Sequence, residues 1–97
     1  MGQVTERWSK EFDNRFFGLP RHLQLRITEK IRALGRQLKS FPHERLQGRN
    51  EFRIRVGDYR VIYEFDPGRN ELSLITLGQE AEMNSLTQLP FREGRAI

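Results

Sequence analysis

The chain has 97 residues, of which 36% are hydrophobic, and this length predicts one domain over residues 1–97 with a single core. It contains no cysteine, which excludes disulfides and thiolate metal sites, and its two histidines lie far apart, so we expect neither a metal nor a cofactor. Lys and Arg number 17 against 13 Asp and Glu, and the net charge of +4 favours nucleic acid or an acidic protein as the partner.

The first predicted elements are a short strand and two helices. We expect a strand over residues 3–8 and then a short helix capped by Ser9, whose side-chain oxygen can accept a backbone hydrogen bond. A longer amphipathic helix is predicted over residues 20–39, where apolar residues recur at helical spacing: Leu23, Ile27, Ile31, Leu34 and Leu38. Gly35 inside this helix indicates either the close approach of another segment or an early helix end.

The run from Arg45 to Phe65, RLQGRNEFRIRVGDYRVIYEF, predicts a β-hairpin. Its central Gly57-Asp58 suits a two-residue turn, because glycine adopts positive φ at little cost. This turn sets the register, and the period of two then places six apolar side chains on the core side: Phe52, Ile54, Val56, Tyr59, Val61 and Tyr63. We expect a last strand over Glu71 to Leu77 and a flexible C-terminal tail over residues 85–97.

The opposite side of the hairpin brings three arginines together, here called the arginine patch: Arg53, Arg55 and Arg60. Arg55 lies directly across from Arg60, and opposed like charges on neighbouring strands cost up to about 1 kcal/mol. Two interpretations stay open. In one, the side chains extend into water and Arg53 pairs with Glu64. In the other, an anion such as an RNA backbone relieves the repulsion, because guanidinium groups match phosphate geometry.

These segments together resemble the RelE/ParE superfamily of bacterial and archaeal toxins. The resemblance covers roughly Val4 to Met83. It depends on the motifs Leu-Gln-Gly, Phe-Arg-Ile-Arg-Val and Gly-Asp-Tyr-Arg-Val-Ile-Tyr, which follow two predicted helices and precede a strand that ends in glycine. It implies an α+β fold in which two N-terminal helices pack on one face of a small antiparallel β-sheet.

The resemblance implies the toxin of a type II toxin–antitoxin system, held inactive by a cognate antitoxin. RelE-like members are ribosome-dependent endoribonucleases that cut mRNA and inhibit translation, and this is the leading expectation. ParE-like members of the same fold instead poison DNA gyrase without nuclease activity, and a degenerate member would only bind its antitoxin. The polar N-terminus and the lack of an apolar run of about 20 residues favour a cytoplasmic protein without membrane contact.

The resemblance also assigns candidate site residues. Arg53, Arg55 and Arg60 match basic positions of the RNA-binding set in RelE-like toxins, and we add Arg49 to the expected RNA-binding residues. The same three arginines are candidate catalytic residues that would stabilise transition-state charge. Arginine does not deprotonate in proteins, so the general base must be another group. Glu44 is the candidate, because YoeB-like relatives carry a glutamate at about this place, and the neighbouring His43 is an alternative.

The segment after Gly78 departs from the ribonuclease pattern. Ribonuclease members carry a basic residue or histidine, an arginine and then a tyrosine, whereas this chain reads Gln79-Glu80-Ala81-Glu82-Met83-Asn84. Glu80 and Glu82 thus replace basic residues, and one interpretation is that they pair with the arginine patch. Whether the chain is a metal-independent endoribonuclease therefore stays open at the level of sequence.

Overall fold

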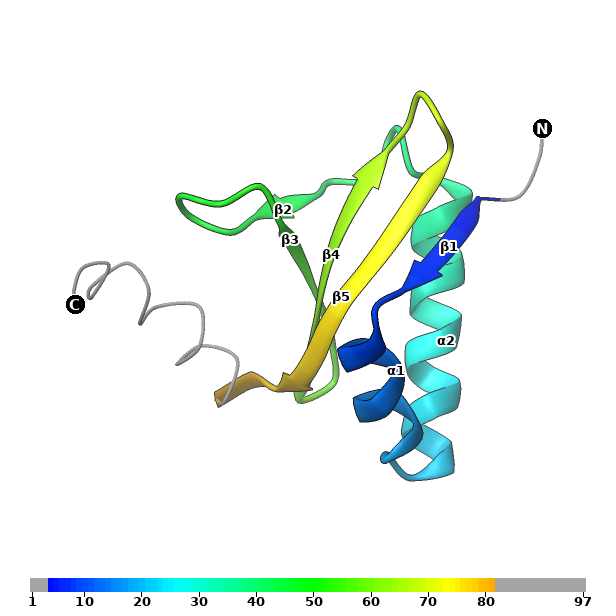
Figure 1. Cartoon of the computed structure of the whole chain (residues 1–97), viewed down its shortest axis with the longest axis vertical. Coiled ribbons are helices and arrows are strands. Elements are labelled where there is room, and N and C mark those ends of the chain that lie inside the picture. The colour runs from blue at the N-terminus through cyan, green and yellow to red at the C-terminus, as the bar shows by residue number, and fades with distance from the viewer. Residues whose placement is uncertain (1–3, 82–97) are drawn as a thin grey trace.

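The computed structural model describes residues 4–81, which form two helices and a five-stranded sheet (Figure 1). The helices are α1 (Lys10–Phe17) and α2 (Arg21–Arg36). The strands are β1 (Thr5–Trp8), β2 (Glu44–Arg45), β3 (Phe52–Val56), β4 (Tyr59–Asp66) and β5 (Glu71–Gln79). Their order in the sheet is β1-β5-β4-β3-β2. The tail predicted over residues 85–97 lies outside the described residues.

The expected α+β fold is confirmed, with one difference in the sheet. Strands β2, β3, β4 and β5 pair antiparallel, but β1 pairs in parallel with β5. Parallel neighbours need a long crossover, and here both helices and the hairpin separate β1 from β5 along the chain. The sheet is therefore mixed, where the sequence predicted an antiparallel one.

Helix α1 begins at the predicted cap and covers part of a sheet edge. The Ser9 Oγ accepts a hydrogen bond from the Phe12 backbone N–H at 2.9 Å, which confirms the cap. Strand β1 pairs only with the first half of β5, and beyond its end the Arg15 guanidinium donates to the Leu77 carbonyl at 3.2 Å. The Ser9 hydroxyl donates to the carbonyl of Ile75 in the same edge. Side chains of α1 and of its N-terminal cap thus satisfy backbone groups that β1 leaves open.

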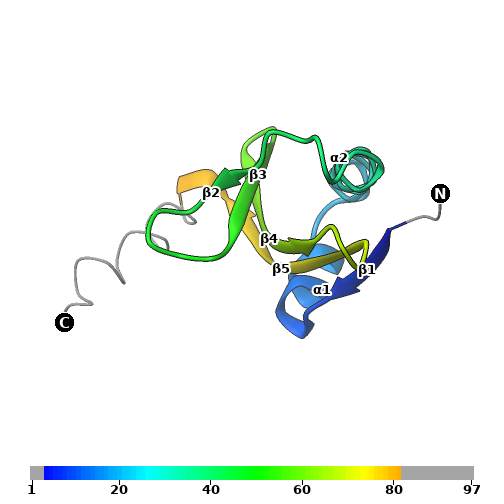
Figure 2. The ribbon, with the colours of Figure 1, turned by 90° about the horizontal axis from the view of Figure 1, so that it is seen from above.

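Helix α2 lies on the concave side of the curved sheet (Figure 2). Most of its predicted apolar face is buried in the same core cluster as Phe12 and Phe16 of α1: Ile27, Ile31 and Leu34, with Leu38 just beyond the helix end. The first residue of that face, Leu23, is only partly buried and lies outside the cluster. Gly35 marks a close approach, because a Cβ at this position would lie 2.6 Å from Val4 Cγ1. The helix ends at Arg36, shorter than the predicted range.

The predicted hairpin register is confirmed. Val56 pairs with Tyr59, Ile54 with Val61 and Phe52 with Tyr63, while Gly57 adopts a φ of +62° in the turn. All six core-side residues belong to the main core, with Phe52 and Tyr59 only partly buried. The core therefore holds one face of the hairpin, and the arginine patch occupies the other.

Among the described residues, neither helix is long and apolar enough to cross a membrane.

Candidate functional site

The arginine patch lies on the outer face of β3 and β4, around a small second apolar cluster. Arg53 and Arg55 flank the buried Ile54 along β3, and the register sets Arg55 opposite Arg60, as predicted. Ile62 pairs with Arg53 and is buried under Leu46 from the loop after β2. The patch is therefore partly sheltered, and only 16% of the Arg60 side chain is exposed.

Arg53 pairs with Glu44. Strand β2 sets Glu44 directly across from Arg53, and the Arg53 Nη2 donates to the Glu44 Oε2 at 2.7 Å. This hydrogen bond lowers the pKa of the Glu44 carboxyl, against the opposing effect of burial. Among the described residues, Glu64 forms no ion pair with Arg53, so the predicted Arg53–Glu64 pair is absent. The buried Arg53 Nε has no hydrogen-bond partner there, so the guanidinium is only partly satisfied.

Glu80 lies between the two directly opposed arginines. Arg60 Nη2 donates to its Oε2 at 3.0 Å, and Arg55 Nε lies 3.6 Å from its Oε1. The Glu80 backbone N–H donates to the Asp58 carbonyl at 2.7 Å, which ties the residue after β5 to the hairpin turn. A carboxylate of the chain itself thus relieves the repulsion that the register imposes. The predicted pairing of Glu80 with the patch is present, whereas Glu82 lies outside the described residues.

Arg49 is not brought to the patch by any contact among the described residues. It lies in the loop between β2 and β3, where its Nε is 2.9 Å from the Glu51 Oε1. Hydrogen bonding from Arg49 lowers the pKa of Glu51. The structure therefore gives Arg49 a local ion pair, and its assignment to RNA binding stays a prediction.

His43 has a structural position. Its Nδ1 lies 2.7 Å from the Tyr63 hydroxyl and its Nε2 lies 2.7 Å from the Leu38 carbonyl. One neutral tautomer satisfies both contacts, with Nε2–H donating to the carbonyl and Nδ1 accepting from the hydroxyl. The ring also stacks on Phe65 at a centroid distance of 3.8 Å. Both nitrogens are thus engaged, and neither is free to exchange a proton with a substrate.

The resulting site is better suited to binding anionic groups than to transferring protons. Three guanidinium groups face the carboxylates of Glu44 and Glu80, which leaves one positive charge in excess. A base with a lowered pKa is a weak proton acceptor, and this applies to Glu44. Among residues 4–81, the patch and its two carboxylate partners include no group suited to protonate a leaving oxygen at neutral pH.

Sequence reasoning missed the element that positions Glu44. Strand β2 has two residues, too few for an alternating pattern, so nothing in the sequence indicated its pairing with β3. It also missed a groove between β1 and α2, where Arg32 and Arg36 lie one helical turn apart. That spacing is visible in the sequence, but on a surface helix it is also typical of a solvated face.

Three solved structures illustrate the similarity of the fold. The archaeal RelE–RelB complex from Pyrococcus horikoshii OT3 has 22% identity and a TM-score of 0.64, covering 81% of this chain and 97% of that one. The RelBE2 toxin–antitoxin complex from Mycobacterium tuberculosis has 20% identity, a TM-score of 0.68 and coverages of 84% and 95%. The YoeB/ParE toxin from Agrobacterium tumefaciens has 16% identity, a TM-score of 0.65 and coverages of 78% and 98%.

Sequence comparison identifies the family. No curated protein sequence matches the chain. The sequence model described as ParE toxin of type II toxin-antitoxin system, parDE, matches residues 7–83, which include both helices, the hairpin and β5. This match covers most of the chain, and the solved structures share the fold of the chain. The chain therefore belongs to the ParE toxin family of type II toxin–antitoxin systems.

Proposed function

We propose that the chain acts as a toxin by binding a protein target, DNA gyrase, as ParE-like toxins do, and not by cleaving mRNA. The observation that carries this proposal is the pairing of the whole arginine patch with carboxylates of the same chain, Glu44 and Glu80. The match to the ParE family supports the same choice. A fold shared with RelE-like toxins does not by itself favour cleavage, because one fold supports several activities.

A phosphate at the patch would have to displace Glu80. The Arg60 guanidinium is largely covered and already hydrogen-bonded to this carboxylate at 3.0 Å. If Glu80 stayed in place, its negative charge would repel the incoming phosphate, and if it left, Arg60 would lose an intramolecular partner. RNA binding thus carries a cost at this site that a purely basic site does not have.

The second part of the proposal is a cognate antitoxin. Several of the solved structures with this fold are complexes of a toxin with its antitoxin, including those from Mycobacterium tuberculosis and Pyrococcus horikoshii OT3. The net charge of +4 suits an acidic partner segment. We therefore expect the chain to bind such an antitoxin tightly and to be inactive in the complex.

The test is inducible expression in a bacterial host with two readouts taken in parallel. We expect a DNA-damage response without codon-phased mRNA cuts, and inhibition of gyrase supercoiling by the purified chain. Codon-phased cuts without the damage response would overturn the proposal in favour of a ribosome-dependent endoribonuclease. Growth without either response would also overturn it, and would indicate a degenerate member that only binds its antitoxin.

A further inference from the structure

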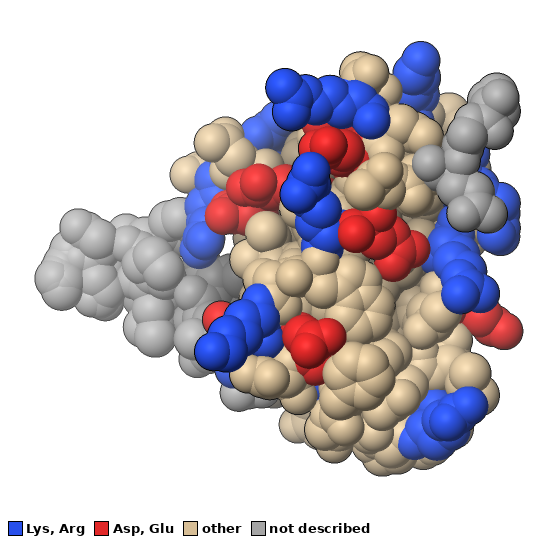
Figure 3. All heavy atoms as spheres, turned by 45° about the vertical axis from the view of Figure 1, so that its right-hand side comes forward, with Lys and Arg blue, Asp and Glu red and all other residues tan. Residues whose placement is uncertain are grey.

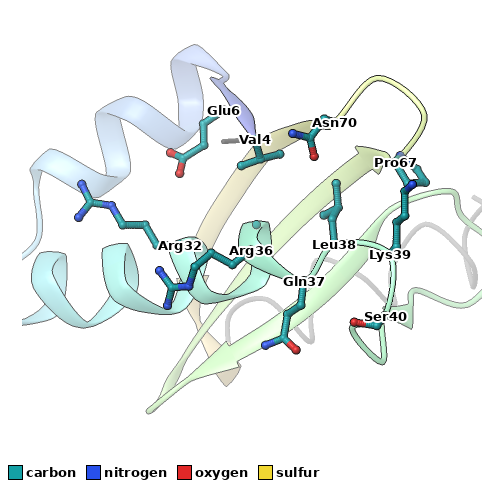
Figure 4. A pocket seen from close by; sticks show the side chains of 11 residues that line it. Val4, Glu6, Arg32, Arg36, Gln37, Leu38, Lys39, Ser40, Pro67 and Asn70 are labelled. Carbon is teal, nitrogen blue, oxygen red and sulfur yellow. The ribbon is translucent and has the colours of Figure 1, made fainter. Parts of the chain in front are cut away.

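The segment between α2 and the loop before β3, residues 37–46, is here called the connecting segment, and it contains β2. The backbone N–H groups described for residues 40–43 bond within the segment, because Ser40 and Phe41 donate to the Gln37 carbonyl and His43 donates to that of Phe41. Side chains must therefore hold this part of the segment against the sheet. Its first four residues line the groove between β1 and α2: Gln37, Leu38, Lys39 and Ser40 (Figure 4).

From His43 onward the connecting segment alternates between the two faces of the sheet. His43 and Arg45 lie on the core side of the hairpin, whereas Glu44 and Leu46 lie on its outer face. Because the side chains of an extended chain alternate, the face that His43 takes decides the face that Glu44 takes. Each of the four residues meets one residue of the hairpin: His43 meets Tyr63, Glu44 meets Arg53, Arg45 meets Phe52 and Leu46 meets Ile62.

His43 is fixed by two hydrogen bonds and by a stacked ring. Its Nδ1 lies 2.7 Å from the Tyr63 hydroxyl, its Nε2 lies 2.7 Å from the Leu38 carbonyl, and its ring stacks on Phe65. Tyr63 is completely buried, and among the described residues its hydroxyl has no other hydrogen-bond partner. Loss of the imidazole would leave a buried hydroxyl unsatisfied, which costs free energy. His43 is therefore a strong anchor for the connecting segment.

The pair between Glu44 and Arg53 has weaker support of its own. Strand β2 contributes two residue pairs at the edge of the sheet, and 63% of the Glu44 side chain is exposed. Exposed ion pairs contribute little, because holding two long side chains in one geometry costs entropy. Acidic side chains also lie among basic ones on the side of the molecule that carries β1 and α2 (Figure 3). The feature that distinguishes Glu44 is its anchored neighbour.

We propose that His43 is a positioning residue: by fixing the connecting segment on the core, it keeps Glu44 on Arg53 and so closes this end of the arginine patch to phosphate groups. When the contacts of His43 are lost, Glu44 moves away. The Arg53 guanidinium, whose buried Nε has no partner among the described residues, is then left to bind an anion. The inference concerns the patch itself and depends neither on gyrase nor on an antitoxin.

The first test follows the titration of the Glu44 carboxyl in the purified full chain by nuclear magnetic resonance. The variant His43→Phe keeps an aromatic ring against Phe65 and removes both hydrogen bonds. In the wild type, the hydrogen bond from Arg53 lowers the pKa of Glu44, and in the variant this pKa is expected to rise towards the ordinary value of about 4.3. Glu51 is the internal control, because Arg49 lowers its pKa and that pKa should stay lowered.

The second test measures the affinity of the chain for tripolyphosphate, used as an anionic probe. His43→Phe is expected to bind it about threefold more tightly than the wild type does, which is the size of effect that one exposed ion-pair partner supplies. The gain should vanish in His43→Phe/Arg53→Gln, because the released guanidinium is then absent. A gain that survives this second substitution would place the probe elsewhere and overturn the proposal.

Ile31→Val is the matched control for lost stability, because it removes one methylene group from the core outside the connecting segment. It should leave the pKa of Glu44 and the affinity for tripolyphosphate as in the wild type, and circular dichroism should show the variants folded. If His43→Phe does not fold, Tyr63→Phe replaces it, since this change removes only the contact to Nδ1 and should raise the pKa of Glu44 by a smaller amount.

Two further results would overturn the proposal. One is an unchanged pKa of Glu44 in a folded variant that lacks the His43 contacts. The other is an equal rise of this pKa in Ile31→Val, which would make the effect a general consequence of lost stability. No gyrase enters either measurement, so failure here leaves the proposed function unaffected.

Discussion

Glu80 holds together two guanidinium groups that the hairpin register places directly opposite each other. Arg55 and Arg60 belong to neighbouring strands with fixed pairing, so they can avoid each other only by side-chain rotation. The carboxylate between them turns a repulsive pair into a three-residue ion network. A single residue after β5 therefore decides whether this face is a free anion site.

Replacing Glu80 with glutamine tests this role. The Glu80→Gln variant should lose about 1 kcal/mol of unfolding free energy, because Arg60 loses a charged partner in a partly sheltered position and faces Arg55 without screening. The same change should strengthen the binding of single-stranded RNA. Denaturant midpoints and RNA-binding titrations measure the two effects.

The exposed Glu64 supplies the control for this experiment, because Glu64→Gln removes the same charge from the same face without a described ion pair. It should change stability very little. A Glu80→Gln variant with unchanged stability and unchanged RNA affinity would contradict the idea that Glu80 occupies the patch.

The Glu44–Arg53 pair predicts a specific dependence of stability on pH. Because the pair lowers the pKa of Glu44 in the folded state, its stabilising effect is fully present above the unfolded pKa of about 4.3 and is lost as the pH falls through the folded value. Between pH 5 and 7 the unfolding free energy of the wild type should exceed that of Glu44→Gln by a roughly constant amount. This difference should shrink as the pH falls below the unfolded pKa of Glu44 and through its lowered folded pKa. Urea midpoints at a series of pH values check this.

A gap that stays constant down to pH 2 or so would show that the effect of Glu44 does not depend on its charge. Glu51→Gln is a useful comparison, since Arg49 lowers the pKa of Glu51 in the same way. The difference in unfolding free energy between the wild type and Glu51→Gln should also shrink as the pH falls.

At the scale of elements, the contact between α2 and Val4, the residue just before β1, depends on Gly35. Glycine in a helix interior is unfavourable relative to alanine, by about 1 kcal/mol. Its presence here is explained by Val4, whose Cγ1 would lie 2.6 Å from an added Cβ. The absence of a side chain at Gly35 lets the residue just before β1 approach the helix, and Gly35 also lines the groove.

Gly35→Ala should therefore destabilise the protein, although helix propensity alone predicts the opposite. We expect a net loss of about 1–2 kcal/mol, because the overpacked contact outweighs the propensity gain. The double variant Val4→Ala/Gly35→Ala should recover most of this loss. Thermal or denaturant unfolding of the two variants and of Val4→Ala measures the coupling between the positions, and a stabilised single variant would show that β1 moves away at little cost.

At the scale of the whole molecule, positive charge is divided between two unlike surfaces. The arginines of the hairpin are paired with Glu44 and Glu80, while Arg32 and Arg36 in the groove have no described partner. The positive charge that is available to partners therefore includes the unpaired arginines of α2, and is not confined to the hairpin. This division agrees with a toxin that recognises proteins.

Expression of the chain alone provides a prediction at this scale. If it is an active toxin, a growing host should yield little of it without the antitoxin, and co-expression with the antitoxin should restore recovery. The yields of the chain alone and of the co-expressed pair, measured in the same strain, check this. High yield of the lone chain in a growing culture would contradict an active toxin and favour a degenerate member.

The sequence by itself determined the helices, the hairpin and the register, because these follow from local rules. Apolar spacing along residues 20–39 predicts α2, and the Gly57-Asp58 turn with a period of two places Arg55 opposite Arg60. The two candidate binding surfaces were decided by the tertiary structure. Pairing of β2 with β3 brings Glu44 to Arg53, and the end of β5 brings Glu80 to Arg60.

The groove and the parallel pairing of β1 also came only from the tertiary structure. Each depends on segments that are far apart in the chain, such as Val4 and Gly35, or Thr5 and Glu71. Local propensity and periodicity report which face of an element is buried, but contain no information on which distant segment covers it. The partner of each charged side chain is settled by that long-range packing, and here the partners determine which arginines remain free to bind.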